Sequence, residues 1–346
     1  MIDWTEAYTA SWRLVKVNQE TWASGAVVPN VNSVSMKRDC TDECPLLESA
    51  SLVFESGTED LDPGWYRVEV LFEQNATLLR LPIMTMLCES AAGDRDKSYI
   101  ALNVDGLSVL QPASERHLLA GTYVPKGVNG AEHAARYIRE CTPAPVVVEG
   151  SFTLDDHLVL DADCSYIKAA WTILNAADWC IQIMGDGTIV IKEKPVDPTL
   201  SLDNAHASIL RPSTSFKKSM DSIPNMYIAV DGNDKYEAVN DDPESRLSTV
   251  TRGRIIDQID RSPVKVNGES LKSYAERKLE DLSTITKTYS YTREWWPDVL
   301  PFSMVRGSIP SHGFDQDMRV LSQSFQFENG ISVSETAGIL IKEYTR

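Results

Sequence analysis

Residues 64 to 72 have the sequence Gly64-Trp-Tyr-Arg-Val-Glu-Val-Leu-Phe72, and this segment sets the class of the structure. Large apolar side chains occupy every second position from Tyr66 to Phe72. Successive side chains of a β-strand point to opposite faces of its sheet, so a period of two is typical of a strand with one buried face. The segment therefore predicts a β structure in the first part of the chain.

Neighbouring segments of the first hundred residues follow the same pattern. They are rich in branched and aromatic residues, and turn-forming residues such as Gly25 and Asp105-Gly106 separate them. The strands that we expect besides 64–72 are residues 12–17, 31–36, 49–54, 76–86 and 99–110. Six or seven strands at this spacing predict a small closed barrel or sandwich, which we assign to residues 1–108.

Helical patterns begin beyond residue 108. Asn129 and Glu132 stand at the spacing of a capping box and predict a helix over residues 130–141. A second helix is predicted where apolar residues recur at i, i+3, i+4 and i+7, namely at Ile167, Ala170, Trp171 and Leu174. These helices belong to a middle domain that we place at residues 109–224.

A hairpin follows the second helix. Residues 179–184 and 188–191 flank Gly185-Asp186-Gly187, which indicates two strands joined by a tight turn. The apolar face of this hairpin suits an aromatic ring, so we expect Trp171 to be buried between the helix and the hairpin. Residues 195–222 contain several prolines and little apolar periodicity, and are expected to form a connector or an irregular excursion.

A third unit is expected at residues 225–283. Its pattern predicts a strand over 225–230 and a helix over 269–282. Between them, the acid-rich residues 231–246 are expected to form a solvated loop. Calcium binding fits this loop poorly, because Lys235 would stand where the EF-hand pattern needs a ligand.

The end of the chain returns to short strands, and we assign residues 284–346 to a second β unit. Asn329-Gly330 is the strongest hairpin signal of the whole sequence. The expected strands are residues 285–292, 302–309, 319–327, 331–334 and 339–344. The fold class that follows is α+β and mainly β, with two small β-barrel-like units at the N- and C-terminal ends that flank a mixed α/β middle region.

Length and charge exclude some functions. The chain has 346 residues, a formal net charge of -17 and a sequence pI near 4.7. This argues against a general nucleic-acid binder, which presents a basic surface to phosphates. The length suggests two to three domains. No run approaches the ~20 apolar residues of a membrane span, and the acidic start carries no export signal, so we expect folding in a cytoplasm.

Recognised motifs for metals and cofactors do not occur in the sequence. The six cysteines are scattered, and we expect reduced thiols. Cys40 and Cys44 form the one close pair, without the second Cys/His pair that a zinc site needs. Glycine-rich phosphate loops are also absent from the sequence. We therefore predict no metal-binding or cofactor-binding residues.

The sequence also fails to match the recognised catalytic patterns. His133 and Cys141 would lie about 12 Å apart along one helix, beyond hydrogen-bond reach. The paired carboxylates Asp155-Asp156 and Asp241-Asp242 are common in acidic proteins, and sequence does not show the separation that glycoside hydrolysis needs. We therefore predict no catalytic residues and no enzymatic activity.

The order of these units resembles the baseplate hub or tail-tip proteins of bacteriophages, relatives of the late-control and tail-associated proteins. The Trp12-Arg13-Leu14 opening also looks like the versions found in siphophages. Four longer stretches carry the likeness: Ser165-Tyr-Ile-Lys-Ala-Ala-Trp-Thr-Ile-Leu-Asn with Trp179-Cys-Ile-Gln-Ile-Met-Gly-Asp-Gly-Thr-Ile, Asn225-Met-Tyr-Ile-Ala-Val, Tyr274-Ala-Glu-Arg-Lys-Leu, and Ile331-Ser-Val-Ser-Glu-Thr-Ala-Gly.

This resemblance implies a structural role in the virion, at the tail tip or baseplate, after assembly in the host cytoplasm. Members of the family are typically homotrimers whose two barrels per subunit form a pseudo-sixfold ring that closes the tail tube. The implied partners are other copies of the chain, tail tube or distal tail ring proteins, the tape measure protein, and tail fibre or spike proteins. Because the chain stops directly after the second β unit, it resembles a bare hub without an added hydrolase domain.

Two other functions stay open. The chain would be a tail-associated peptidoglycan hydrolase if some of its carboxylates formed an active site. It would be a carbohydrate-binding β module if exposed aromatic rings stacked on sugars. Strand-borne aromatic residues more often serve a core or an interface, and the residues in question are Trp4, Trp12, Trp22, Trp65 and Trp295-Trp296.

Overall fold

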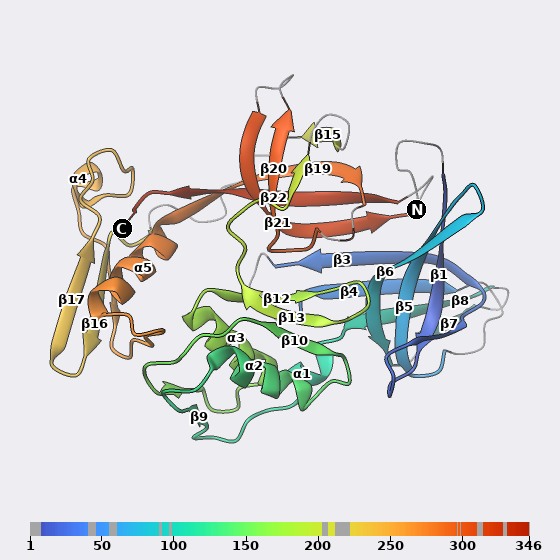
Figure 1. Ribbon diagram of the computed structural model, residues 1–346, viewed down its shortest axis with the longest axis horizontal. Coiled ribbons are helices and arrows are strands. Elements are labelled where there is room, and N and C mark those ends of the chain that lie inside the picture. The colour runs from blue at the N-terminus through green and yellow to red at the C-terminus, as the bar shows by residue number, and fades with distance from the viewer. Residues whose placement is uncertain are drawn as a thin grey trace.

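The computed structural model describes residues 8–40, 46–54, 61–89, 92–96, 99–202, 207–211, 222–295, 297, 299–309, 314–327 and 331–345. Most regular structure in these residues is β, and a 14-stranded sheet extends through the molecule (Figure 1). The mainly β class predicted from the sequence is therefore confirmed.

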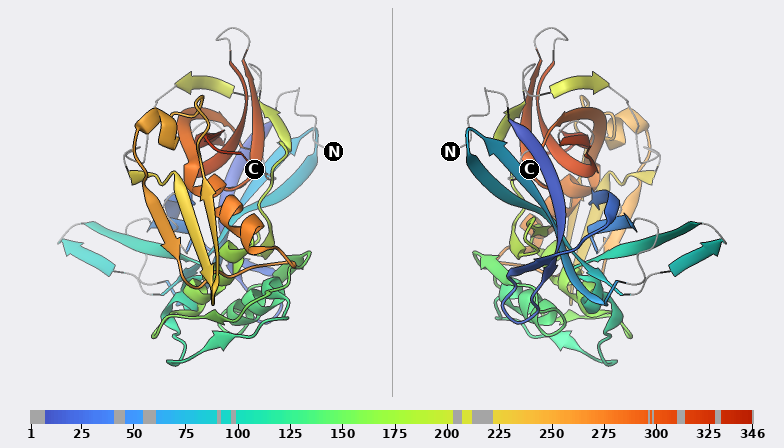
Figure 2. Two further views of the ribbon diagram at one scale, coloured as in Figure 1. Left: turned by 90° about the vertical axis from the view of Figure 1, so that its left-hand side faces the viewer. Right: turned by 90° about the vertical axis from the view of Figure 1, so that its right-hand side faces the viewer.

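Eight strands of this sheet come from the first 108 residues. Figure 2 shows one hairpin, β7 with β8, extending away from the rest of the molecule. The eight strands are β1 (Thr9–Val17), β2 (Ser24–Val27), β3 (Val31–Asp39), β4 (Glu48–Phe54), β5 (Gly64–Gln74), β6 (Thr77–Cys88), β7 (Ala92–Asp96) and β8 (Tyr99–Ser108).

The end of the chain adds four strands, and the segment 195–222 adds two more. The predicted connector is thus partly regular, because β14 pairs with β20 and β15 pairs with β19. The six strands are β14 (Leu200–Leu202), β15 (Ala207–Arg211), β19 (Thr284–Glu294), β20 (Met304–Ile309), β21 (Phe314–Gln326) and β22 (Ser332–Lys342).

Strand β21 joins the two terminal β units. It pairs with β20 through its first residues and, beyond the end of β20, with β3 from Ser322 opposite Asp39 to Phe325 opposite Met36. Eleven of the fourteen strands follow one open path from β15 to β2, and β7, β14 and β20 pair off this path. Over the described residues no closed barrel is present, so the predicted arrangement of two barrel-like units is not confirmed. The reason is that β21, thirteen residues long, extends past β20 and offers its free backbone groups to β3.

A shared hydrophobic core accompanies this pairing. Leu14 and Phe72 of the first unit lie in one buried cluster with Phe325 and Val333 of the last unit. The rings of Phe72 and Trp295 are stacked, with their centroids 6.4 Å apart and 5° between their planes. Stacked aromatic pairs add to the stabilisation from buried area, so side-chain packing and backbone pairing hold the same boundary together.

Helices and a small sheet form the middle of the chain. Asn129 and Ser165 cap α2 and α3, each accepting a hydrogen bond from the backbone three residues later, as the capping pattern predicts for α2. The predicted hairpin is confirmed as β12 paired with β13, and β10 extends it in parallel. The elements are α1 (Gln111–Glu115), β9 (Tyr123–Val124), α2 (Gly130–Arg139), β10 (Val146–Glu149), β11 (Leu158–Val159), α3 (Tyr166–Ala176), β12 (Trp179–Ile183) and β13 (Ile189–Glu193).

The remaining unit packs a helix on a three-stranded sheet. Its elements are β16 (Met226–Asp231), β17 (Asp234–Val239), α4 (Thr249–Arg252), β18 (Asp257–Asp260) and α5 (Leu271–Ser283). The expectation of a loop over 231–246 is wrong for residues 234–239, which form β17. Tyr236 and Ala238 of β17 pack toward α5, and this apolar face outweighs the acidic composition of the segment.

Two further expectations concern the burial of Trp171 and the turn at Asn329-Gly330. Trp171 is half-buried rather than buried, and its ring lies tilted against Phe302, with the centroids 6.2 Å apart. The Asn329-Gly330 turn lies outside the described residues, although β21 and β22 on either side of it pair in antiparallel fashion. The domain boundaries at residues 108, 224 and 283 stay predictions.

Candidate functional site

Two sets of polar contacts bind the middle unit, which comprises α1 to β13, to the rest of the molecule. The first set surrounds the tip of the β12–β13 hairpin. Met184 and Thr188 close the turn, since the backbone N–H of Met184 donates to the carbonyl of Thr188 at 2.9 Å. The Asp186 carboxylate accepts from the backbone N–H of Thr188, also at 2.9 Å. Gly187 has a φ of 82°, a left-handed conformation that favours glycine. The tip is therefore a tight, internally bonded turn.

Side chains of the first β unit form a socket around this tip. The Trp22 indole N–H and the Arg67 guanidinium both donate to the carbonyl of Asp186, each at 2.7 Å. The Thr85 hydroxyl donates to the carbonyl of Gly185 at 3.1 Å. We call Trp22, Arg67 and Thr85 the hairpin socket. It satisfies carbonyl groups that the turn itself leaves without donors.

Close backbone approach explains the two glycines of the turn. A Cβ atom on Gly185 would lie 2.1 Å from the carbonyl oxygen of Pro82, and one on Gly187 would lie 2.8 Å from Thr85 Cβ. Pro82 sits where the register between β5 and β6 shifts, which marks a bulge. The bulge and the glycines together let the hairpin contact the sheet.

Arg67 is the central polar group of the socket. Besides Asp186, it donates to the hydroxyls of Thr85 at 2.9 Å and Ser24 at 3.1 Å. Burial lowers the pKa of its guanidinium, with nearby Asp186 and Glu69 acting in the opposite direction. Burial acts to raise the pKa of Glu69, but hydrogen bonds from Ser24 and Arg13 outweigh it and lower that pKa. The socket is thus a hydrogen-bonded network rather than an isolated buried charge.

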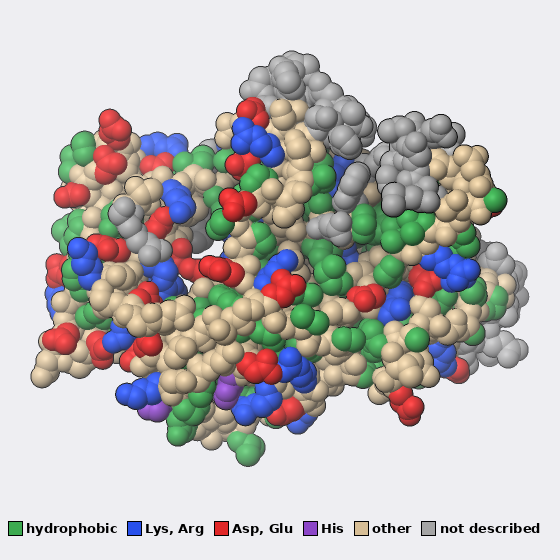
Figure 3. Space-filling view, in the orientation of Figure 1, with side chains coloured by type: hydrophobic (Ala, Val, Ile, Leu, Met, Phe, Trp, Pro, Cys, Tyr) green, Lys and Arg blue, Asp and Glu red, His purple; other side chains and the backbone are tan. Residues whose placement is uncertain are grey.

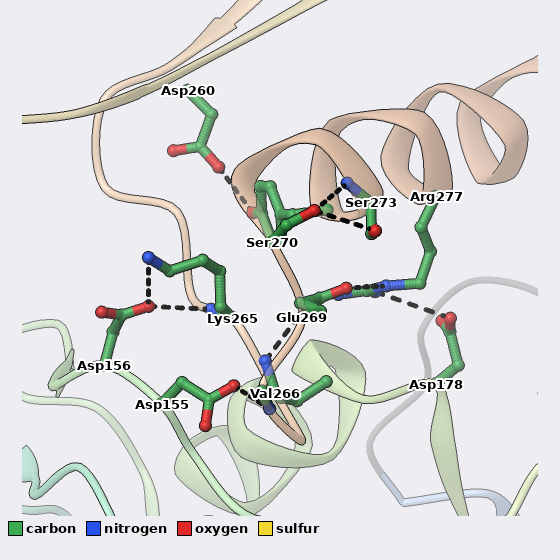
Figure 4. Close-up of polar contacts among 12 residues, drawn as sticks. Asp155, Asp156, Asp178, Asp260, Lys265, Val266, Glu269, Ser270, Ser273 and Arg277 are labelled. Atoms are coloured by element: carbon green, nitrogen blue, oxygen red, sulfur yellow. Dashed lines mark hydrogen bonds and ion pairs between the residues drawn. The ribbon is translucent and has the colours of Figure 1, made fainter. Parts of the chain in front are cut away.

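The second set of polar contacts is a charged junction between the middle unit and α5 (Figure 4). Asp155 accepts from the backbone N–H of Gly268 at 2.5 Å. Asp156 accepts from the backbone N–H of Lys265 at 3.2 Å, and the Lys265 ammonium pairs with Asp231 at 2.6 Å. These carboxylates therefore bind the segment that leads into α5.

Arg277 of α5 completes the junction. Its guanidinium lies 2.6 Å from Glu269 and 3.7 Å from Asp178, which directly precedes β12. Glu269 in turn accepts from the backbone N–H of Val266 at 3.1 Å. The Arg277 and Glu269 side chains are only 9% and 13% exposed, so water screens this ion pair weakly, whereas the Asp178 side chain is 39% exposed. We call Asp155, Asp156, Asp178, Lys265, Glu269 and Arg277 the charged junction.

Asp155, Asp156, Asp242, His133 and Cys141, which were considered from the sequence as catalytic candidates, each make contacts within the fold. Asp155 and Asp156 hold backbone N–H groups, and Asp242 accepts from the backbone N–H of Glu244. The Cys141 thiol donates to the carbonyl of Tyr137 at 3.3 Å, and burial raises its pKa. The His133 ring contacts the Arg136 guanidinium and the Tyr137 ring.

In the part of the chain that the structure describes, no three His, Cys, Asp or Glu side chains are grouped to hold a metal ion, and Cys44 lies outside this part. No helix of the described residues is long and apolar enough to cross a membrane.

The hairpin socket was not foreseen from the sequence, although its turn was. The Arg67 guanidinium and the Asp186 carbonyl are separated by 119 residues, and no local periodicity signals such a contact. The one available signal was the pair of glycines in Gly185-Asp186-Gly187, since a turn that needs two glycines often lies against another backbone. The charged junction likewise joins segments distant in sequence.

Three solved structures share the whole fold. The tail protein from Neisseria meningitidis MC58 has 17% identity and a TM-score of 0.66, covering 96% of this chain and 97% of that one. The 43 kDa tail protein of prophage MuSo2 from Shewanella oneidensis has 12% identity and a TM-score of 0.62, covering 97% and 99%. Prophage tail protein gp18 from Listeria monocytogenes EGD-e has 10% identity and a TM-score of 0.55, covering 95% and 94%.

At these identities the likeness shows a shared fold. The chain therefore has the fold of phage tail proteins, as its resemblance predicts. Neither a protein-family model nor a curated protein sequence matches it.

The socket predicts a difference between two glycine substitutions. Gly187→Ala and Gly127→Ala both place a Cβ at a left-handed residue, with φ near 82° and 81°, but only Gly187 has atoms within 4 Å. We expect Gly127→Ala to lower the unfolding free energy by about 1 to 2 kcal/mol from backbone strain. Gly187→Ala should cost about 1 to 3 kcal/mol more from overpacking against Thr85. Urea unfolding measures both; equal losses would show that the tip does not contact the socket.

The charged junction predicts unequal effects of two arginine substitutions. Arg277→Gln leaves the largely buried Glu269 without its cation and should lower the unfolding free energy by about 3 to 5 kcal/mol. Arg306→Gln removes a cation that also has two carboxylate partners, Asp315 and Asp317, but at the surface, so its loss should be small. Thermal unfolding of both variants checks this, and a loss at Arg277 as small as that at Arg306 would contradict the assigned role.

Proposed function

We propose that the chain is a structural subunit of a bacteriophage tail, located in the virion at the tail tip or baseplate and assembled in the host cytoplasm. The observation that carries this proposal is the agreement of fold with phage tail proteins over nearly the whole of both chains. Fold alone does not imply function, but the internal organisation of the molecule supports the same assignment.

The described residues are organised to hold their units in fixed positions. One sheet joins the terminal β units, the hairpin socket binds the middle unit, and the charged junction binds α5. A protein that connects other proteins needs surfaces in constant relative positions. The polar contacts of the hairpin socket and the charged junction keep these units in fixed positions, and the carboxylates of the junction take part in them.

The finer proposal is a baseplate hub or tail-tip subunit that forms a homotrimeric ring, closes the tail tube and connects it to other tail components. Its partners would be tail tube or distal tail ring proteins, the tape measure protein, and tail fibre or spike proteins. On the face shown in Figure 3, Lys and Arg side chains are interspersed with Asp and Glu rather than gathered in one area. Such a surface suits protein partners better than the phosphate backbone of nucleic acid.

A non-enzymatic role is part of the proposal. Asp155 and Asp156, the adjacent carboxylates considered for a hydrolase, bind backbone groups of the charged junction. The sugar-binding alternative is weakened because Trp65 and Trp295 are 6% and 9% exposed, and Trp22 donates its N–H to the hairpin. Trp4 and Trp296 lie outside the described residues.

The proposed homotrimeric ring predicts the mass of the protein in solution. We expect sedimentation equilibrium of the purified protein to give about three times the 38.5 kDa of one chain, and electron microscopy to show a ring. If subunits assemble only on a tail, the ring should form when the partner ring protein is added.

Two results would contradict the proposed function. A monomer at micromolar concentration that also fails to join a tail ring would exclude the hub. Clearing of a peptidoglycan gel that is abolished by one carboxylate substitution would favour the hydrolase instead.

A further inference from the structure

Glu48 is a buried acid with an unusual set of partners. It begins β4, and one carboxylate oxygen accepts from Arg38 Nε on β3 at 2.7 Å. Both side chains are only 2% exposed. Its other oxygen, Oε2, is buried without a hydrogen-bond partner among the described residues. An ionised carboxylate is costly at a buried position where one oxygen has no hydrogen-bond partner among the described residues, whereas a neutral carboxyl costs less.

A cavity of about 10 Å³ lies beside Glu48, where three parts of the molecule meet. Gln182 of the hairpin donates to the carbonyl of Pro301 at 2.7 Å and so ties the hairpin to the loop of residues 299–303. This volume is near the lower limit for one water molecule. The lining comes from β3 and β4, the hairpin, and this loop: Arg38, Leu47, Glu48, Ile181, Gln182, Ile183 and Pro301.

Arg38 does not depend on Glu48 alone. Its guanidinium also donates to the carbonyl of Ile83 and lies 5.2 Å from the centre of the Phe325 ring on β21. A cation over an aromatic face is stabilised by the ring. Arg38 is the one charged neighbour in the cavity lining, because the hairpin and the loop contribute uncharged side chains. The arginine can thus stay charged when the glutamate is neutral.

We propose that Glu48 is a proton-sensitive joint: its neutral form packs the hairpin and residues 299–303 tightly on β3 and β4, and its ionised form loosens them. Burial supports this by raising the pKa of Glu48 from its ordinary 4.5 to about 7, although Arg38 acts to lower it. Between these two values the folded chain binds a proton that the unfolded chain does not. Stability from this group therefore rises as the pH falls from about 7 toward 4.5 and is absent above about pH 7.

The test compares the wild-type protein with Glu48→Gln, whose uncharged side chain mimics the neutral form. Urea unfolding at pH 8 and pH 5 gives the folding equilibrium constant of each. We expect the ratio of the wild-type constant to that of the variant to rise on the order of 50-fold from pH 8 to pH 5. Glu132→Gln is the control, since Glu132 is exposed and pairs with Arg139 on α2, and its ratio should stay constant.

Hydrogen exchange locates the effect. The wild-type amides of residues 181–183 and of residues 299, 300, 302 and 303 should exchange more slowly at pH 5 than at pH 8 after correction for the intrinsic rate, and those of Glu48→Gln should not change. A neutral carboxyl has its own C=O stretch, so the infrared difference spectrum between pH 8 and pH 5 should contain a band in the wild-type protein that is missing in Glu48→Gln. A carboxylate still ionised at pH 5, or exchange at these amides that does not depend on pH, would overturn the proposal.

Discussion

Backbone pairing between β3 and β21 is the constraint on which the rest of the structure depends. Four residue pairs join strands that lie nearly 300 positions apart in the chain, and they turn two terminal units into one sheet. Buried backbone groups need partners, so the free part of β21 beyond β20 must be paired. The two terminal units consequently share one sheet, and the β12–β13 hairpin lies against it.

The β3–β21 pairing also brings the main polar contacts close together. Arg38, opposite Gln323 in the β3–β21 pairing, reaches Glu48 on β4 and lies over Phe325 of β21. The hairpin approaches the same region through Gln182, while its tip enters the hairpin socket. The sheet, the middle unit and the last unit are therefore coupled at one place. Such coupling suits a scaffold whose partners must meet fixed surfaces, and it makes a single buried acid able to influence several units.

Local features of the fold were predictable because local physics determines them. The alternation in residues 64–72 gave β5, the side chain of Asn129 caps α2, and the turn at Gly185-Asp186-Gly187 joins β12 and β13. Long-range pairing was not predictable, since alternation shows that a strand exists but not which strand lies beside it. Two separate barrel-like units were expected for that reason. Composition misled at residues 234–239, where a few apolar contacts with α5 decide the structure.

The local part of the candidate site was predictable from the sequence, whereas its long-range contacts were not. The turn could be identified from sequence, but its partners Trp22, Arg67 and Thr85 could not, because each belongs to another part of the chain. Buried ion pairs such as Arg277 with Glu269 also leave no mark in a sequence with many charged residues.

Native-state hydrogen exchange in low denaturant tests the central claim, that one sheet makes the molecule a single scaffold, most directly. The account predicts that amides of β3, β21, β22 and the β12–β13 hairpin open with one common free energy, equal to that of global unfolding. Opening of β19 to β22 in a separate step of lower free energy, with β3 and β4 still protected, would contradict it.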